Sequence, residues 1–342
     1  MQWYKSINQA PKISPFKIPS EIQSIVCDIH KQLREEDNFC GAQSIYWTME
    51  DLGIKNIPSV RTINRILSRN GLLTRQKGKY EKKGTKYPLL KAEKVNQIHQ
   101  MDFVGPCYLR KLRFYSVNVV DLATRRCAVQ PILSKSSQNV INAIWLIWQR
   151  LGIPKNLQMD NEMSFYGSQR YPRGMGPIIR LCLANNSSPL FIPQKEPWRN
   201  GVVENFNNHY QQKFLSKKIM HNYEELLQFS LAFEQKYNSS FRLSAIKGKT
   251  PLAMLNNLND KLVFPNNTNA PQHPLKKPRK GKYSLIRLIR SDNLLNIFGE
   301  SFKVPSSLMY EYAIAIINVK EQKLLIHDSN KNLIKTYDYN MF

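Results

Sequence analysis

The spacing of apolar residues predicts three short helices within residues 1–74. Apolar side chains recur at three- and four-residue steps from Ser20 to Leu33, and again between Gly41 and Gly53. A third run follows Ser59, a residue type that caps helix N-termini, and places Val60 and Leu67 on the inner side. The first segment is therefore expected to be an all-α domain.

The outer side of the third predicted helix is polar and basic. It carries Arg61, Thr62, Asn64, Arg65 and Arg69. Three short helices with such a last helix are typical of a helix-turn-helix, and Arg and Asn are the side chains that read guanine and adenine edges. The alternative is an ordinary three-helix bundle with a solvated basic face.

The apolar pattern changes period in the middle of the chain and predicts an α/β domain. Alternating or continuous apolar runs predict strands, and runs with a 3.6-residue period predict helices. The predicted strands cover residues 98–104, 113–120, 127–132, 157–160 and 190–192, and the predicted helices cover 137–151 and 177–183 and a long stretch from 201. Three strands in succession, then a helix and a strand, describe a mixed sheet flanked by helices.

Short strands at regular spacing predict a separate β module at the C-terminus. They cover residues 283–290, 302–304, 312–319, 323–328 and 333–337, with Asn, Asp and Gly turns between them. A small closed β-barrel of SH3-like type fits this pattern. Its Arg287, Arg290 and Lys303 suit phosphate contacts, and a dimerisation or stability module is the alternative.

The net charge of the chain predicts a polyanionic partner. Among 342 residues, 50 Lys and Arg face 25 Asp and Glu, which gives a net charge of +25. Such a charge calls for nucleic acid or a membrane surface as partner, and double-stranded DNA is the leading candidate. No run of about 18 apolar residues predicts a membrane span, so no membrane partner is expected. The five cysteines are scattered, which predicts reduced thiols and a cytoplasmic, nucleoid-associated protein.

Composition also divides the chain into segments. Basic stretches interrupted by Gly and Pro predict linkers at residues 75–95 and 263–282, where Lys82 and Lys83 could follow DNA phosphates. The expected division is a helix-turn-helix at 1–74, a catalytic core at 96–262 and the β module at 283–342, separated by these linkers.

Three carboxylates are the candidates for catalysis. Asp102 lies in a predicted strand, Asp160 ends another, and Glu204 lies on the helix that Gly201 opens. Phosphodiester cleavage and transfer need an activated attacking oxygen and a stabilised leaving oxygen, and two divalent ions about 4 Å apart provide both. Carboxylates are the natural ligands of Mg²⁺ or Mn²⁺. We therefore expect two such ions at Asp102, Asp160 and Glu204.

The motifs around these carboxylates resemble a known family. QMDFVG, QMDNEMSF and PWRNGVVENF, which hold Asp102, Asp160 and Glu204, are similar to the D, D, E triad of insertion-sequence transposases related to retroviral integrases. PSVRTINRIL looks like the family's DNA-binding helix. The resemblance implies a ribonuclease-H-like catalytic core between the helix-turn-helix and the β module, cleavage at element ends, and strand transfer of the 3′-hydroxyl into target DNA. It also implies a homodimer or a higher synaptic complex.

The chain departs from the family pattern at three places. The interval between Asp160 and Glu204 is wider than usual, which predicts a loop insertion after Tyr166. Glu162 stands where the family usually has Gly. The chain has one clear helix-turn-helix where relatives often carry two, which points to an N-terminally truncated reading frame.

Neighbouring polar residues complete the set of predictions. Asn207, Asn208 and Gln211 follow Glu204 at helical spacing and are candidates for contacting the DNA end. Glu196 is expected to be solvated, and Trp198 either packs beneath the catalytic loop or stacks on a base. Two other functions stay open at this point: a DNA-binding regulator derived from an inactive transposase, and a nuclease acting on RNA–DNA hybrids.

Overall fold

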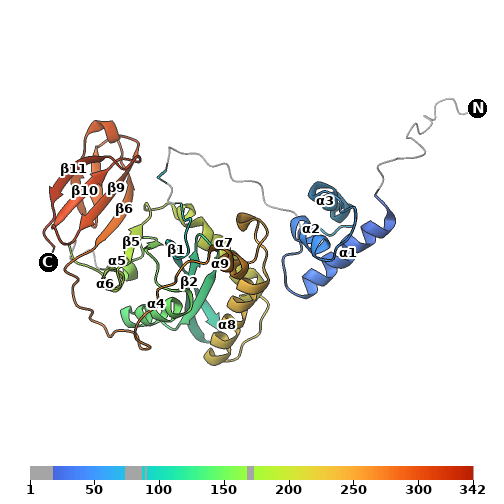
Figure 1. Cartoon of the computed structure of the whole chain (residues 1–342). Coiled ribbons are helices and arrows are strands. Elements are labelled where there is room, and N and C mark those ends of the chain that lie inside the picture. The colour runs from blue at the N-terminus through green and yellow to red at the C-terminus, as the bar shows by residue number, and fades with distance from the viewer. Residues whose placement is uncertain (1–17, 74–86, 89–90, 168–172, 342) are drawn as a thin grey trace, which may run out of the picture. The chain divides into compact units, whose positions relative to one another are not determined.

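The computed structural model describes residues 18–73, 87–88, 91–167 and 173–341. The chain divides into two compact units, Met1–Tyr80 and Glu81–Phe342 (Figure 1). In the described ranges, no helix has the length and apolar character needed to cross a membrane. The finer division into five segments stays a prediction.

The first unit consists of three helices around a small core, as the sequence predicts. They are α1 (Ser20–Glu35), α2 (Ala42–Asp51) and α3 (Val60–Arg69). Val26, Ile45 and Ile63, one from each helix, are fully buried together. Ser59 caps α3, since its side chain accepts a hydrogen bond from the Thr62 amide at 3.3 Å. The helix-turn-helix assignment itself stays a prediction.

In its described residues the second unit is built on one nine-stranded mixed sheet. Figure 1 shows the C-terminal strands β6, β9, β10 and β11 of this sheet in red and orange. The first three strands of the sheet are antiparallel neighbours, and β4 and β5 then add to β1 in parallel. The strand order across the sheet is β11-β10-β9-β6-β5-β4-β1-β2-β3. In chain order the strands are β1 (Ile98–Leu109), β2 (Leu112–Asp121), β3 (Cys127–Ile132), β4 (Asn156–Met159), β5 (Ser188–Phe191), β6 (Lys282–Leu288), β9 (Tyr312–Asn318), β10 (Lys323–His327) and β11 (Leu333–Asp338). The predicted mixed sheet is confirmed.

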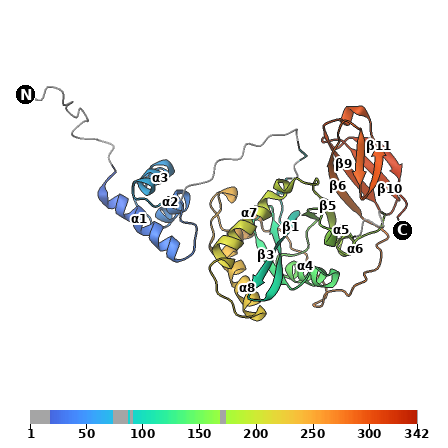
Figure 2. The ribbon, with the colours of Figure 1, turned by 180° about the vertical axis from the view of Figure 1, so that it is seen from behind.

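Helices cover both faces of the core part of this sheet (Figure 2). Met101 is buried against residues of α4, whereas its neighbour Asp102 is hydrogen-bonded to α7, because successive strand residues point to opposite faces. The helices of the second unit are α4 (Ser137–Leu151), α5 (Met163–Tyr166), α6 (Pro177–Ala184), α7 (Gly201–Tyr210), α8 (Tyr223–Ser240) and α9 (Pro251–Leu258), with short helical turns η1 (Pro197–Asn200), η2 (Gln211–Leu215), η3 (Ser244–Ile246) and η4 (Ser306–Leu308).

The C-terminal strands continue the sheet of the core. Strand β6 pairs in parallel with β5, with Leu190 opposite Ser284, and β9, β10 and β11 follow as antiparallel neighbours. Strands β7 (Leu294–Ile297) and β8 (Glu300–Lys303) form a separate hairpin. The strand content largely follows the prediction, apart from β7, but the segment shares a sheet with the core, and its closure into an SH3-like barrel stays a prediction.

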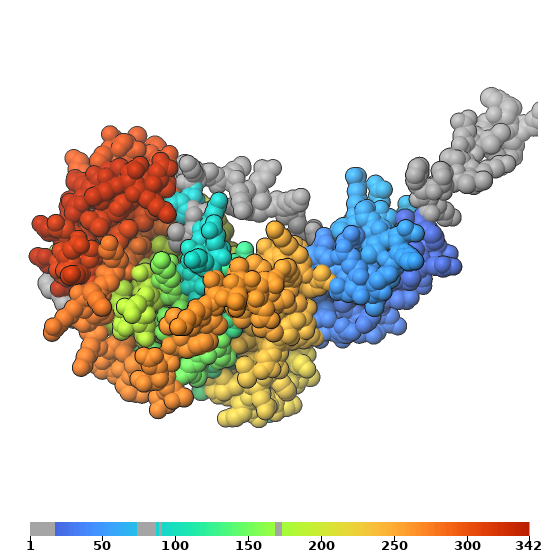
Figure 3. Space-filling model, in the orientation of Figure 1, coloured from blue at the N-terminus to red at the C-terminus, as the bar shows by residue number. Residues whose placement is uncertain are grey.

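The stretch before β6 lies on the surface of the core. The Trp145 indole N–H donates to the carbonyl of Asn267 at 3.0 Å, and Arg180 donates to the carbonyl of Leu275 at 2.8 Å. Figure 3 shows this stretch in orange across the core. The predicted second linker is therefore attached along α4 and α6 by hydrogen bonds.

Candidate active site

The structure brings the three predicted carboxylates into electrostatic contact. Asp102 lies in β1, Asp160 directly follows β4, and Glu204 lies in the first turn of α7. The pKa of Asp102 is raised from 3.8 to about 7, mainly by burial and then by the negative charges of Asp160 and, more weakly, Glu204. Carboxylates that lie far from Asp102 in the chain therefore act on its charge.

Asp102 is held by two amides. Its Oδ1 accepts a hydrogen bond from the Phe103 amide at 2.8 Å, and its Oδ2 accepts one from the side-chain amide of Asn207 at 2.8 Å. Both bonds lower the pKa of Asp102, but burial and the neighbouring carboxylates outweigh them. The carboxylate is therefore oriented for a further partner with positive charge.

Asp160 shares its surroundings with an ion pair. Burial raises the pKa of Asp160, the hydrogen bond from the Glu162 amide at 3.1 Å lowers it, the negative charge of the Glu162 side chain raises it, and Lys135 lowers it. The Lys135 ammonium lies 3.0 Å from Glu162 Oε2 and 4.4 Å from the ring centroid of Phe103. Glu162, the departure from the family pattern, thus has a cation of its own beside the site. Burial also raises the pKa of Glu204.

A repeated Gln-Met-Asp triplet connects the two aspartates to the helix of Glu204. Gln100 and Gln158 precede Asp102 and Asp160 by two residues, so each lies on the same face of the sheet as its aspartate. Gln100 Oε1 accepts hydrogen bonds from the amides of Val202 and Val203 at 3.0 and 3.1 Å. These are orphan amides of the first turn of α7, so Gln100 caps the helix.

The second triplet holds the turn before the same helix. Gln158 donates to the carbonyl of Arg199 at 3.1 Å, and Asn200 donates to the carbonyl of Met101 at 2.8 Å. The strands that carry the aspartates therefore also fix the start of α7 and with it Glu204. Sequence reasoning missed these glutamines, although the repeated triplet was a signal that could have found them.

Asn207 has a different environment from the one predicted. It is 6% exposed, its amide donates to Asp102, and its Oδ1 accepts from Asn118 at 2.8 Å. Its polar atoms are occupied by these buried partners, so its position fits orientation of Asp102 and does not fit the predicted DNA contact. Asn208 and Gln211 are exposed and stay predicted DNA contacts.

The other predicted DNA contacts lie mainly on α3. Arg61, Asn64, Arg65 and Arg69 are exposed, and the Thr62 hydroxyl is hydrogen-bonded to that of Ser59 at 3.0 Å. Lys82 and Lys83 lie outside the described residues. Exposure is compatible with DNA binding, and the contacts themselves stay predictions.

The donor chemistry of the site suits a hard divalent cation. Carboxylate oxygens are the preferred ligands of Mg²⁺ and Mn²⁺. A cation between Asp102, Asp160 and Glu204 would offset the repulsion that raises the pKa of Asp102. Within the described parts of the chain, no three His, Cys, Asp or Glu side chains are yet arranged as a complete metal-binding group.

Comparison with known families gives a match in this region. Residues 186–251 match the family model described as "Integrase core domain", a stretch that includes β5, the turn before α7 and Glu204. This match supports the predicted resemblance of the chain to integrase-like transposases. A search of curated proteins gave no match.

Solved structures of retroviral integrases resemble this chain at low similarity. The HTLV-2 integrase catalytic core domain in complex with magnesium, in its trimeric form, is 18% identical, covers 48% of this chain and 99% of its own, and has a TM-score of 0.38. The simian T-cell lymphotropic virus intasome in complex with the PP2A regulatory subunit B56 gamma is 14% identical, covers 84% and 91% respectively, and has a TM-score of 0.44. Values this low carry no argument about function.

Proposed function

We propose that this chain is a metal-dependent DNA transposase that cleaves element ends and transfers the resulting 3′-hydroxyl into target DNA. The observation that supports it most is the raised pKa of Asp102, about 7, to which the charges of Asp160 and Glu204 contribute beside burial, in a chain whose residues 186–251 match the integrase core domain model. Two Mg²⁺ or Mn²⁺ ions held by these residues would activate the attacking oxygen and stabilise the leaving oxygen.

The reaction balances without a covalent protein intermediate. In the first step a water oxygen attacks the phosphorus at the element end, the bond from phosphorus to the 3′-oxygen breaks, and the 3′-oxygen takes a proton. In the second step that 3′-hydroxyl attacks a target phosphodiester, whose own 3′-oxygen leaves. Asn207 and the Phe103 amide keep the Asp102 carboxylate oriented in both steps.

The remaining predicted residues would bind DNA. The exposed arginines of α3 and Asn64 would read the element end, and Lys82, Lys83 and the net charge of +25 would hold phosphates. Trp198 is 49% exposed beside the helix of Glu204, which favours stacking on a base over packing beneath the loop. Because two ends must be joined, the active species would be a homodimer or a larger assembly.

The test is strand transfer with the purified full chain and oligonucleotides that carry the inverted repeats flanking its gene. We expect Mg²⁺-dependent products from the wild type, and loss of at least about 100-fold in rate with Asp102→Asn or Glu204→Gln, since each removes a charged ligand. The control is Glu224→Gln, which alters an exposed carboxylate on α8. Full activity of either site variant would refute the assignment. Binding of the repeats by a wild type that never cleaves would favour the DNA-binding regulator.

A further inference from the structure

Strand β6 contributes a buried arginine to the turn that follows Asp160. Arg287 is 7% exposed, and burial lowers its pKa to about 10. Its guanidinium donates to Asn161 Oδ1 at 2.8 Å and to the carbonyl of Ile192 at 3.1 Å. Asn161 in turn donates to the same carbonyl at 2.6 Å. The predicted phosphate contact of Arg287 is wrong, because its charge is enclosed between the C-terminal strands and the residue after Asp160.

Strand β9 contributes a tyrosine to the turn that precedes Glu204. The Tyr312 hydroxyl donates to Glu196 Oε2 at 2.8 Å and accepts from Arg199 Nη2 at 3.0 Å. Arg199 and Glu196 also form an ion pair at 3.0 Å, with side chains only 17% and 13% exposed. Glu196 is therefore not solvated, contrary to the sequence-based expectation, and the turn η1 is fixed to the C-terminal strands.

The end of the predicted first linker joins the same cluster. The guanidinium of Arg199 lies 4.0 Å from the ring centroid of Tyr87, and the rings of Tyr87 and Tyr312 meet edge-to-face at 5.0 Å. The Tyr87 hydroxyl has no hydrogen-bond partner among the described residues, so the contacts with Arg199 and Tyr312 are made by the ring.

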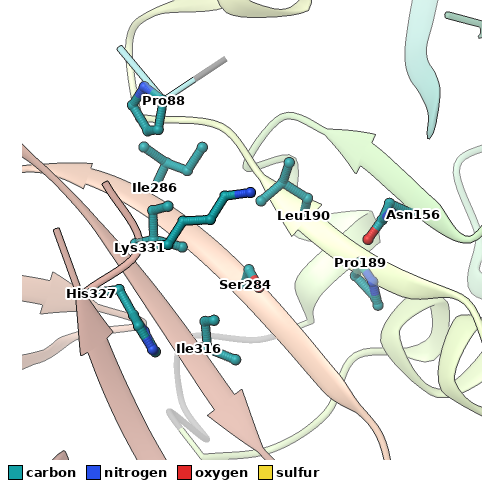
Figure 4. A pocket seen from close by; sticks show the side chains of 10 residues that line it. Pro88, Asn156, Pro189, Leu190, Ser284, Ile286, Ile316, His327 and Lys331 are labelled. Carbon is teal, nitrogen blue, oxygen red and sulfur yellow. The ribbon is translucent and has the colours of Figure 1, made fainter. Parts of the chain in front are cut away.

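A cavity lies beside this contact. Pro88 borders this cavity of about 250 Å³, whose other walls include Leu190, Ile286 and Ile316 (Figure 4). Tyr87, the neighbour of Pro88, packs on Arg199 and Tyr312 and on the apolar cluster of Leu190 and Ile286, and so attaches this part of the chain.

We propose that the C-terminal strands position two of the three carboxylates. Arg287 orders the turn after Asp160, Tyr312 orders the turn before Glu204, and Tyr87 attaches the linker to the second of these turns. All three are positioning residues that act through Asn161 and Arg199. The proposal rests on the proposed function for the role of the carboxylates.

The proposed positioning depends on the strength and the location of the hydrogen bonds made by Tyr312 and Arg287. Hydrogen bonds to charged groups at low exposure are the strong ones, and Tyr312 and Arg287 each make at least one. Glu204 follows Arg199 by only a few residues, so loss of the contacts that hold this turn would let the Glu204 carboxylate move. Displacements of about 1 Å can cost two orders of magnitude in rate.

Hydrogen exchange of the full chain tests the proposal without any activity. We expect Tyr312→Phe to accelerate exchange at the amides of residues 199–204 by about tenfold or more, because it removes the hydroxyl between two charged groups. The amides of α4 should be unchanged. The matched control is Tyr310→Phe, because Tyr310 is 56% exposed. Wild-type exchange at 199–204, or equal acceleration throughout the core, would overturn the proposal.

A second pair of variants separates the ring of Tyr87 from its hydroxyl. Tyr87→Ala should accelerate exchange at the same amides, and Tyr87→Phe should keep the wild-type rate because the hydroxyl has no partner among the described residues. Identical behaviour of the two variants would contradict the assigned contact. For Arg287→Lys we expect faster exchange at 161–165, since Lys cannot reproduce the planar fork. Wild-type exchange there would refute the assignment of Arg287.

Activity gives the second readout. Tyr312→Phe should lower the rate of strand transfer at saturating DNA, with the DNA dissociation constant unchanged, because the hydroxyl acts on the catalytic turn. Weaker DNA binding at an unchanged maximal rate would overturn the positioning role. A chain that shows the local exchange response but never transfers strands would refute the proposed function and leave the positioning intact.

Discussion

The raised pKa of the Asp102 carboxyl should make the folded protein less stable as the pH rises. The carboxyl of Asp102 has a pKa of about 7 in the folded protein and an ordinary value of 3.8, so between these values the unfolded chain is ionised while the folded chain keeps the proton. Folding stability therefore falls as the pH rises from 3.8 to 7 and is constant above. Replacing Asp102 by Asn removes this loss.

The expected magnitude follows from the pKa. A displacement from 3.8 to about 7 corresponds to about 4 kcal/mol at pH 8. Asn can accept only one of the two hydrogen bonds that Asp102 accepts, which costs about 1 kcal/mol. Partial exposure screens the charges further, so we expect Asp102→Asn to stabilise the fold by about 2–3 kcal/mol at pH 8. At pH 5 most of this gain should be absent, because the folded wild type is then protonated.

The assay is chemical denaturation of the full chain in buffer with a chelator, because a bound cation would reverse the effect. The control variant is Asp338→Asn, an exposed position at the end of β11, which should change the free energy of unfolding by less than about 0.5 kcal/mol. A stability change for Asp102→Asn that is the same at both pH values, or a loss at pH 8, would refute the raised pKa of Asp102 in the folded protein.

Two further predictions concern the amides that organise the site. Asn207→Ala should destabilise the fold by about 2 kcal/mol, because it removes the acceptor of the buried Asn118 amide and one of the two donors to Asp102, whereas Asn208→Ala should change stability little. Thermal denaturation of both variants decides this, and equal effects would contradict it. Gln100→Leu should cost about 1–2 kcal/mol and accelerate hydrogen exchange at the first turn of α7, which it caps. Unchanged exchange there would show that the cap is dispensable.

The sequence by itself determined most local structure and pointed to three candidate carboxylates. Helix α4 and strand β3 have the predicted bounds, because apolar periodicity is a local signal. The three acidic residues were found because each lies in a short motif whose chemistry makes sense only with the other two. Local patterning and motif chemistry need no knowledge of the tertiary fold.

Only the tertiary structure decided which side chains hold those carboxylates in place. Asn207 and Arg287 both looked like DNA contacts, since a polar face and a basic strand are read from sequence as solvated. Folding buries both, because α7 lies across β1 and because β6 joins the sheet beside β5. Pairing between residues over 100 positions apart leaves no periodic trace in a single sequence, so the partners of Asp102 and Tyr312 could be known only from the fold.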